Sequence, residues 1–140
     1  MSKVAVVYYS GTGNTEAMAQ AVAEGIRTAG SDAELIECGS FSPEKVSGYD
    51  GFALGCPAMG DESLEDSEFE PMYDSIKTSL TGKKVALFGS YGWGDGEWMR
   101  NWEADIKAAG VTLASDPVIA NETPDDDAIE KCKALGAALV

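Results

Sequence analysis

Short apolar runs alternate with longer segments of helical periodicity along this chain, and that alternation restricts the fold more than any other feature of the sequence. The apolar runs are strand-like and cover residues 3–9, 33–38, 51–56, 83–90 and, with an interruption, 111–120. The helical segments cover residues 15–29, 69–79, 97–109 and 125–138. Strands that alternate with helices predict a parallel sheet with helices on both faces. We therefore expect an α/β fold, a three-layer doubly wound sheet of five parallel strands.

Length and hydropathy suit a single domain that spans residues 1–140. A chain of 140 residues, 44% of them hydrophobic, is long and apolar enough to bury a core of its own. No apolar stretch approaches the roughly 18 residues that a membrane span needs. Because Met1 to Lys3 lead directly into the first predicted strand, we expect no signal peptide and a cytoplasmic location.

The charge balance and two scarce residue types argue against several classes of function. The formal net charge is −14, which is unfavourable for nucleic acids and anionic membranes as partners. There is no histidine, the commonest general acid or base, so a binding or carrier role is favoured over catalysis. Cys38, Cys56 and Cys132 form no CxxC pair, and we expect three reduced thiols rather than a zinc site or a disulfide.

The candidate site lies in the loops that follow the predicted strands. In doubly wound sheets, ligands bind beyond the carboxyl ends of the strands, where the strand order reverses. The loops at that edge follow the first, third, fourth and fifth strands. Their sequences are SGTGNT (10–15), PAMGDE (57–62), YGWGDG (91–96) and NETPD (121–125).

The first loop, SGTGNT, suits a phosphate group although it contains no lysine. It is not a P-loop, because the GK[ST] ending is missing, and the third glycine of a dinucleotide fingerprint would fall at Glu16. Backbone N–H groups at the start of a helix can still surround an anion, and hydroxyl groups can complete the cage. Each charge-assisted hydrogen bond contributes roughly 1.5–3 kcal/mol. The alternative is an ordinary strand-to-helix turn.

The second and third loops offer apolar side chains beside glycines. Met59 precedes Gly60, which suits a turn whose peptide can take either orientation. Trp93 lies between Gly92 and Gly94, where the packing of a helix or strand does not explain an indole ring. Taken singly, the second loop also reads as a turn with a loosely packed methionine. Together with the phosphate cage, the two loops predict a site for a phosphorylated, flat ring system.

At these residues the chain resembles a flavodoxin, of the short-chain kind found in anaerobic bacteria. The likeness extends over nearly the whole length and is carried by YYSGTGNTEAMA (8–19), LGCPAMGDESLEDSEFEP (54–71), GKKVALFGSYGWGDGEWMR (82–100) and NETPD (121–125). The resemblance implies noncovalently bound FMN and a low-potential one-electron carrier that shuttles electrons between redox enzymes in place of ferredoxin. It implies an electron-transfer protein without catalytic residues or a metal. We expect a monomer, because nothing in the sequence marks a large apolar interface.

The resemblance also assigns the loops to parts of the cofactor. The SGTGNT loop would hold the FMN phosphate, with Ser90 near the phosphate or the ribityl chain, and Met59 and Trp93 would cover the two faces of the isoalloxazine ring. The residues expected to contact the cofactor are Ser10, Gly11, Thr12, Gly13, Asn14, Thr15, Pro57, Ala58, Met59, Gly60, Asp61, Glu62, Ser90, Tyr91, Gly92, Trp93, Gly94 and Asn121.

Some of these residues take particular roles by resemblance. The peptide between Gly60 and Asp61 would turn on reduction, so that its carbonyl accepts a hydrogen bond from the ring, and Glu62 would bind the N3–H group. Asn121 would lie near the ribityl chain or the dimethylbenzene part of the ring. Some family members have serine where this chain has Pro57, so that phosphate contact should be absent here.

An acidic segment suggests how partners bind. Between Lys45 and Lys77 the chain has no basic residue and eight acids. Six of the acids crowd one stretch: Asp61, Glu62, Glu65, Asp66, Glu68 and Glu70. We interpret this stretch as a docking patch for basic redox partners, and the alternative is a solvated face. Acidic surroundings and a phosphate cage without lysine would also leave the negative charge of a reduced flavin uncompensated, which favours a low potential.

Other proteins with similar folds fit the sequence less well. A receiver domain would need an aspartate at the end of the third strand, where the chain has Cys56 and Pro57. A low-molecular-weight phosphatase would need an arginine at Glu62. A small FMN-dependent quinone or NAD(P)H reductase would need a substrate pocket and a hydride source, and the sequence has no obvious nicotinamide site. The reductase is the alternative that we retain.

Overall fold

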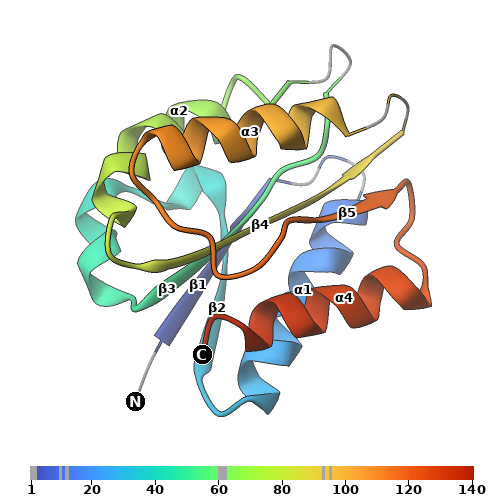
Figure 1. The fold of residues 1–140 in the computed structure, drawn as a ribbon, viewed down its shortest axis with the longest axis horizontal. Coiled ribbons are helices and arrows are strands. Elements are labelled where there is room, and N and C mark those ends of the chain that lie inside the picture. The colour runs from blue at the N-terminus through green and yellow to red at the C-terminus, as the bar shows by residue number, and fades with distance from the viewer. Residues whose placement is uncertain (1–2, 10, 12, 60–62, 93, 95) are drawn as a thin grey trace.

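The order of helices and strands follows the alternation in the sequence (Figure 1). The computed structural model describes residues 3–9, 11, 13–59, 63–92, 94 and 96–140. The strands are β1 Lys3–Tyr8, β2 Asp32–Glu37, β3 Gly51–Gly55, β4 Lys84–Tyr91 and β5 Val118–Asn121. The α-helices are α1 Asn14–Thr28, α2 Phe69–Ile76, α3 Glu97–Ala108 and α4 Asp126–Ala137. Short 3₁₀ segments are η1 Cys38–Ser40, η2 Pro43–Gly48 and η3 Lys77–Leu80.

The strands form one parallel sheet in the order β2-β1-β3-β4-β5. The chain places β2 on one side of β1 and then crosses to build β3, β4 and β5 on the other side. The strand order therefore reverses between β1 and β3, and a crevice is expected at the carboxyl ends of these two strands. This topology confirms the expected doubly wound sheet.

The side chains of β1 show why both faces of the sheet are covered. The strand is buried from its second residue to its last. Val4, Val6 and Tyr8 pack with α1 and α4 on one face, whereas Ala5 and Val7 pack with α2 and α3 on the other. A strand without a polar face is typical of a parallel sheet buried on both sides. Figure 1 shows α2 and α3 above the sheet and α1 and α4 below it.

Helices α1 and α4 cross at two glycines. A Cβ atom at Gly25 would overlap with the carbonyl group of Lys133, and one at Gly136 would overlap with the carbonyl group of Val22. Only glycine permits backbone to approach backbone so closely. The crossing therefore fixes α1, whose first turn contains the last two residues of the SGTGNT sequence.

The expected fifth strand, 111–120, is regular only at its end. From Val118 onward it pairs with β4, whereas Leu113 forms a single isolated bridge with Val85. Pro117 stands between the two pairings and has no N–H group to donate to a ladder. The other expected strands and helices are confirmed, with small shifts at their ends.

The described part of the chain offers neither a membrane span nor a cluster of metal ligands. No helix there is long and apolar enough to cross a membrane. No group of three or more histidine, cysteine, aspartate or glutamate residues there forms a candidate metal site. Cys38, Cys56 and Cys132 are buried free thiols.

Candidate functional site

A pocket opens at the carboxyl ends of β1, β3 and β4, where the strand order reverses. Its volume is about 380 Å³, within the range of small-molecule sites. The residues that line it are Tyr9, Gly11, Asn14, Pro57, Ala58, Met59, Ser90, Tyr91, Gly92 and Glu122. This lining combines aromatic rings, a thioether and small polar groups, and none of these residues is basic.

The start of α1 supplies a polar end to the pocket. Gly13 is the N-cap of α1 and has a φ of 93°, a left-handed conformation that glycine adopts without strain. Its carbonyl accepts the N–H of Ala17 at 3.0 Å, which begins the helical ladder. No side chain among the described residues caps this helix. A helix start of this kind attracts an anion through its N–H groups and its dipole.

Thr15 joins α1 to β4 beneath the pocket. Its hydroxyl oxygen lies 3.1 Å from the Ser90 hydroxyl oxygen and accepts the Ser90 N–H at 3.4 Å. The two side chains are buried, with 1% and 4% of their surface exposed. Ser90 lines the pocket and Thr15 does not. Thr15 therefore acts on the pocket through Ser90.

The end of β4, with Ser90 and Tyr91, forms one wall of the pocket, and residues 57–59 form a second wall. Hydrogen bonds hold both ends of this second wall. The Ala58 N–H donates to the carbonyl of Ser90 at 2.9 Å. The Met59 N–H donates to the carbonyl of Ser63 at 3.0 Å. The second wall is therefore fixed to β4 through Ala58 and to Ser63 through Met59.

Trp98, from α3, supports two walls at once. Its indole N–H donates to the Cys56 carbonyl at 3.1 Å, directly before the second wall. Its ring centroid lies 5.5 Å from that of Tyr91, which lines the pocket. A Cβ atom at Gly89 would overlap with the Cys56 carbonyl, so this close approach of β4 requires glycine.

Glu122 lines the pocket, which the sequence does not predict. Asn121 is the residue that the NETPD motif suggests, but it ends β5 and does not line the pocket. Glu122 has a φ of 55°, uncommon for a residue other than glycine, and its N–H donates to the Tyr91 carbonyl at 2.7 Å. The motif locates the loop but not which of its residues lines the pocket.

The structure brings together most described members of the predicted set. Those that line the pocket are Gly11, Asn14, Pro57, Ala58, Met59, Ser90, Tyr91 and Gly92. Those that do not are Gly13, Thr15, Gly94 and Asn121. The predicted residues that lie outside the described part of the chain are Ser10, Thr12, Gly60, Asp61, Glu62 and Trp93. Sequence reasoning missed Tyr9, which the apolar run places inside the first strand, whereas β1 ends one residue earlier.

One acid of the predicted docking patch, Glu65, is wrong for that role, because only 4% of its surface is exposed. Its carboxylate accepts the N–H groups of Glu68 at 2.7 Å and Phe69 at 2.8 Å, and so caps the start of α2. It also accepts both the N–H and the hydroxyl of Ser67. Burial opposes ionisation, but these hydrogen bonds lower the pKa of Glu65 to about 2. The described acids of the patch that are exposed are Asp66, Glu68 and Glu70.

Two other hollows are larger but fit a cofactor less well. One of about 880 Å³ lies beside residues 110–116, ahead of β5, and has no aromatic residue in its lining. Another of about 480 Å³ shares Tyr9 with the pocket and is lined by the acids Glu37 and Glu68. Neither is lined by residues from the start of α1, so the pocket at the strand reversal is the candidate site.

Comparison with known proteins decides the family. The flavodoxin family model matches residues 6–136. This chain belongs to the flavodoxin family. It is 49% identical over 121 residues to a flavodoxin of Clostridium beijerinckii, covering 86% of this chain and 88% of that protein. It is 46% identical over 135 residues to a flavodoxin of Megasphaera elsdenii, covering 96% of both. The solution structure of two-electron reduced Megasphaera elsdenii flavodoxin matches with a TM-score of 0.89 and 46% identity, covering 97% of both chains.

Membership of the family establishes the general function. Flavodoxins bind FMN and carry electrons, and they are electron-transfer proteins rather than enzymes. At 46% and 49% identity to flavodoxins, the chain is an FMN-binding electron carrier, and the reductase alternative is not favoured. Flavodoxins are themselves an example of the strand-reversal rule, with FMN between the first and third strands. The pocket lies at that point and fits a phosphorylated ring, because it joins a helix start to aromatic and apolar walls.

Proposed function

We propose that FMN binds in this pocket with its phosphate at the start of α1 and its ring against Met59 and Tyr91. The observation that carries the proposal is the pocket, where Gly11 and Asn14 meet these two side chains. The helix start favours a dianion, and the thioether and the phenol ring favour a flat apolar group. FMN supplies the electron-carrying chemistry, while the residues of the chain bind and orient it.

The charges around the pocket support a low reduction potential. None of the described lining residues is basic, and one of them, Glu122, is acidic. A unit negative charge about 10 Å from a reduced, anionic flavin costs roughly 1.5 kcal/mol at an effective dielectric constant of about 20. That cost corresponds to about 60–70 mV for one electron before salt screening. We infer that the protein is a strong reductant that can serve in place of ferredoxin.

Donor and acceptor oxidoreductases would dock beside the pocket through basic side chains. Asp66, Glu68 and Glu70 are exposed after the second wall. Glu68 also borders, with Glu37, the hollow that shares Tyr9 with the pocket. A formal charge of −14 should make association with a basic partner fast and sensitive to salt.

Residues 1–140 would act as one FMN-binding domain, monomeric and cytoplasmic. The flavodoxin family model spans residues 6–136 without division. Helices pack against both faces of the sheet. The large hydrophobic side chains exposed in the described part of the chain are scattered at Leu35, Ile119 and Val140, which does not suggest a large apolar interface.

Flavin affinity tests the cofactor proposal. The purified chain should retain FMN and show the visible absorbance of oxidised flavin. Thr15→Ala removes the buried hydroxyl beside Ser90 and should weaken FMN binding by roughly 1–3 kcal/mol, with little effect on riboflavin. Thr15→Ser keeps the hydroxyl and is the matched control. Equal binding of FMN and riboflavin by the wild type would contradict a phosphate site at the start of α1.

A further inference from the structure

The described residues 57–59 and 63–64, which include the second wall, form a segment that a hydrogen bond closes at its base. The Cys56 thiol accepts the N–H of Glu65 at 3.4 Å, which joins the residues directly before and after the segment. The Cys56 backbone is held independently, because its carbonyl accepts the Trp98 indole N–H and its N–H donates to the Phe88 carbonyl at 3.1 Å. Cys56 is fully buried and Glu65 nearly so, which limits competition from water for these bonds.

Glu65 also fixes the start of α2. Its carboxylate accepts the N–H groups of Ser67 at 2.9 Å, Glu68 at 2.7 Å and Phe69 at 2.8 Å. Its carbonyl accepts the N–H of Glu70 at 2.9 Å. Hydrogen bonds to an ionised acceptor are roughly twice as strong as neutral ones, and burial strengthens them further. Glu65 therefore joins the start of α2 firmly to the base of the segment.

We propose that Glu65 is a positioning residue for the cofactor, whose buried carboxylate keeps Pro57, Ala58 and Met59 oriented to bind the flavin ring. This role depends on the proposed function, because those three residues line the pocket where FMN is proposed to bind. The Met59–Ser63 hydrogen bond carries a shift at the base of the segment to Met59. The hydrogen bonds of Glu65 described above connect the segment to α2 and not to α1. Loss of Glu65 should therefore weaken contacts to the ring and spare those to the phosphate.

The dissociation constants of the full-length chain for FMN and for riboflavin test this proposal. Glu65→Gln keeps the size of the side chain but turns one acceptor oxygen into an NH₂ group that faces N–H donors. FMN and riboflavin binding should weaken by the same factor, about tenfold. The visible circular dichroism of the bound flavin, which reports the surroundings of the ring, should change as well.

Two variants separate positioning from other effects. Asp66→Asn removes the same charge from the neighbouring exposed residue, and both dissociation constants should stay within about twofold of the wild type. Glu65→Asp keeps the charge but shortens the reach of the carboxylate, so it should behave as Glu65→Gln does. Thr15→Ala, at the phosphate end, should weaken FMN binding far more than riboflavin binding.

Far-UV circular dichroism and a urea titration establish whether Glu65→Gln is folded. If it is not, Cys56→Ala takes its place, because it removes the acceptor of the Glu65 N–H while Cys56→Ser retains one. Cys56→Ala should then weaken both flavins equally, and Cys56→Ser should bind them as the wild type does. The proposal is overturned if the folded variant binds both flavins normally, or if only FMN binding is weakened. Failure of the wild type to bind flavin would instead refute the proposed function.

Discussion

The two helical layers hold the two ends of the site by different means. On one face of the sheet, α1 and α4 cross at Gly25 and Gly136, where backbone meets backbone and no side chain can be added. On the other face, α2 and α3 meet through aromatic rings. Trp102 packs edge-on against Phe69 and Tyr73, with ring centroids 5.4 Å and 6.0 Å apart. The first layer presents the helix start, where we propose that the phosphate binds, and the second supports the walls where we propose that the ring binds.

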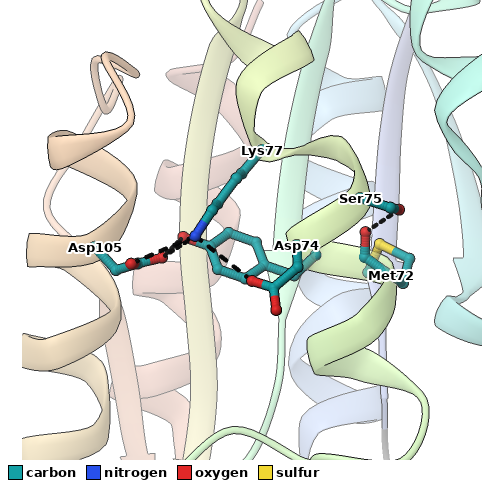
Figure 2. Close-up of polar contacts among 6 residues, drawn as sticks. Met72, Asp74, Ser75, Lys77 and Asp105 are labelled. Carbon is teal, nitrogen blue, oxygen red and sulfur yellow. Dashed lines mark hydrogen bonds and ion pairs between the residues drawn. The ribbon is translucent and has the colours of Figure 1, made fainter.

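Polar side chains add further links within the α2/α3 layer. Figure 2 shows the Lys77 ammonium beside the carboxylates of Asp105 at 3.1 Å and Asp74 at 3.5 Å. The hydroxyl of the buried Tyr73 donates to the Asp105 carboxylate at 2.7 Å. Burial, reinforced by this hydrogen bond, raises the pKa of Tyr73 above its usual value. Each of these links can be removed alone.

This difference predicts how each end of the site tolerates mutation. A contact between two backbones has no side chain that can give way, so added atoms displace a whole helix. A side-chain hydrogen bond can be removed without disturbing the others, and each removal lowers the unfolding free energy by about 0.5–3 kcal/mol. We therefore expect substitutions in the α1/α4 layer to threaten folding, and substitutions in the α2/α3 layer to adjust the ring end.

Gly136→Ala should cause the largest loss of stability. Its Cβ atom would overlap with the Val22 carbonyl, and we expect the free energy of unfolding to fall by about 3 kcal/mol or more. Urea titration measures the change. Gly48→Ala is the control, because nothing lies within 4 Å of its Cβ position. Equal stability of the two variants would show that α1 and α4 do not cross closely.

Lowering the pH should destabilise the α2/α3 layer by protonating Glu65. Its folded-state pKa of about 2 lies below the ordinary value of 4.5, so its stabilising effect is complete above pH 4.5 and is lost as the pH falls towards 2. We expect a loss of about 3 kcal/mol over this range. Glu65→Gln cannot titrate and should show a shallower dependence in urea titrations at each pH. If the wild type and Glu65→Gln lost the same unfolding free energy as the pH falls, Glu65 would not be the cause of the acid sensitivity.

Tyr73→Phe should cost less, about 1–2 kcal/mol of unfolding free energy, since it removes one hydrogen bond to a carboxylate that keeps Lys77 as a partner. Thermal or urea unfolding measures the cost. Combining it with Asp105→Ala should cost less than the sum of the two single changes, because both remove the bond between the hydroxyl and the carboxylate. Fully additive costs would show that the hydroxyl and the carboxylate stabilise the layer separately.

The smallest effect is expected at the surface. Changing Asp66 and Glu68 to their amides should slow reduction by a basic redox partner by about two- to fivefold at low salt, and the difference should vanish at high salt. Stopped-flow absorbance measures the rate. The control changes Asp32 and Asp116, exposed acids away from the pocket, to asparagine. Equal slowing by both pairs would leave net charge rather than a docking patch as the cause.

The fold expected from the sequence and the observed fold agree where a hydrophobic pattern extends over a whole strand or helix. Strands without a polar face and helices with apolar residues four apart are strong signals, and loops that follow parallel strands must meet at one edge. Glu122 could not be predicted, because which residue of the loop lines the pocket depends on the backbone angles of the loop. Glu65 could not be told from Asp66 and Glu68, because nothing in a run of acids marks the one that the turn before α2 buries.

The location of the cofactor is tested most directly by the amide NMR spectrum of the full-length chain during flavin titration. FMN should shift the amides of Gly11 and Asn14 at the phosphate end and those of Met59 and Gly92 at the ring end. Riboflavin, which has no phosphate, should shift Met59 and Gly92 but leave Gly11 and Asn14 nearly unchanged. Shifts centred on residues 110–116, or identical shifts with the two flavins, would contradict a pocket with a phosphate end and a ring end.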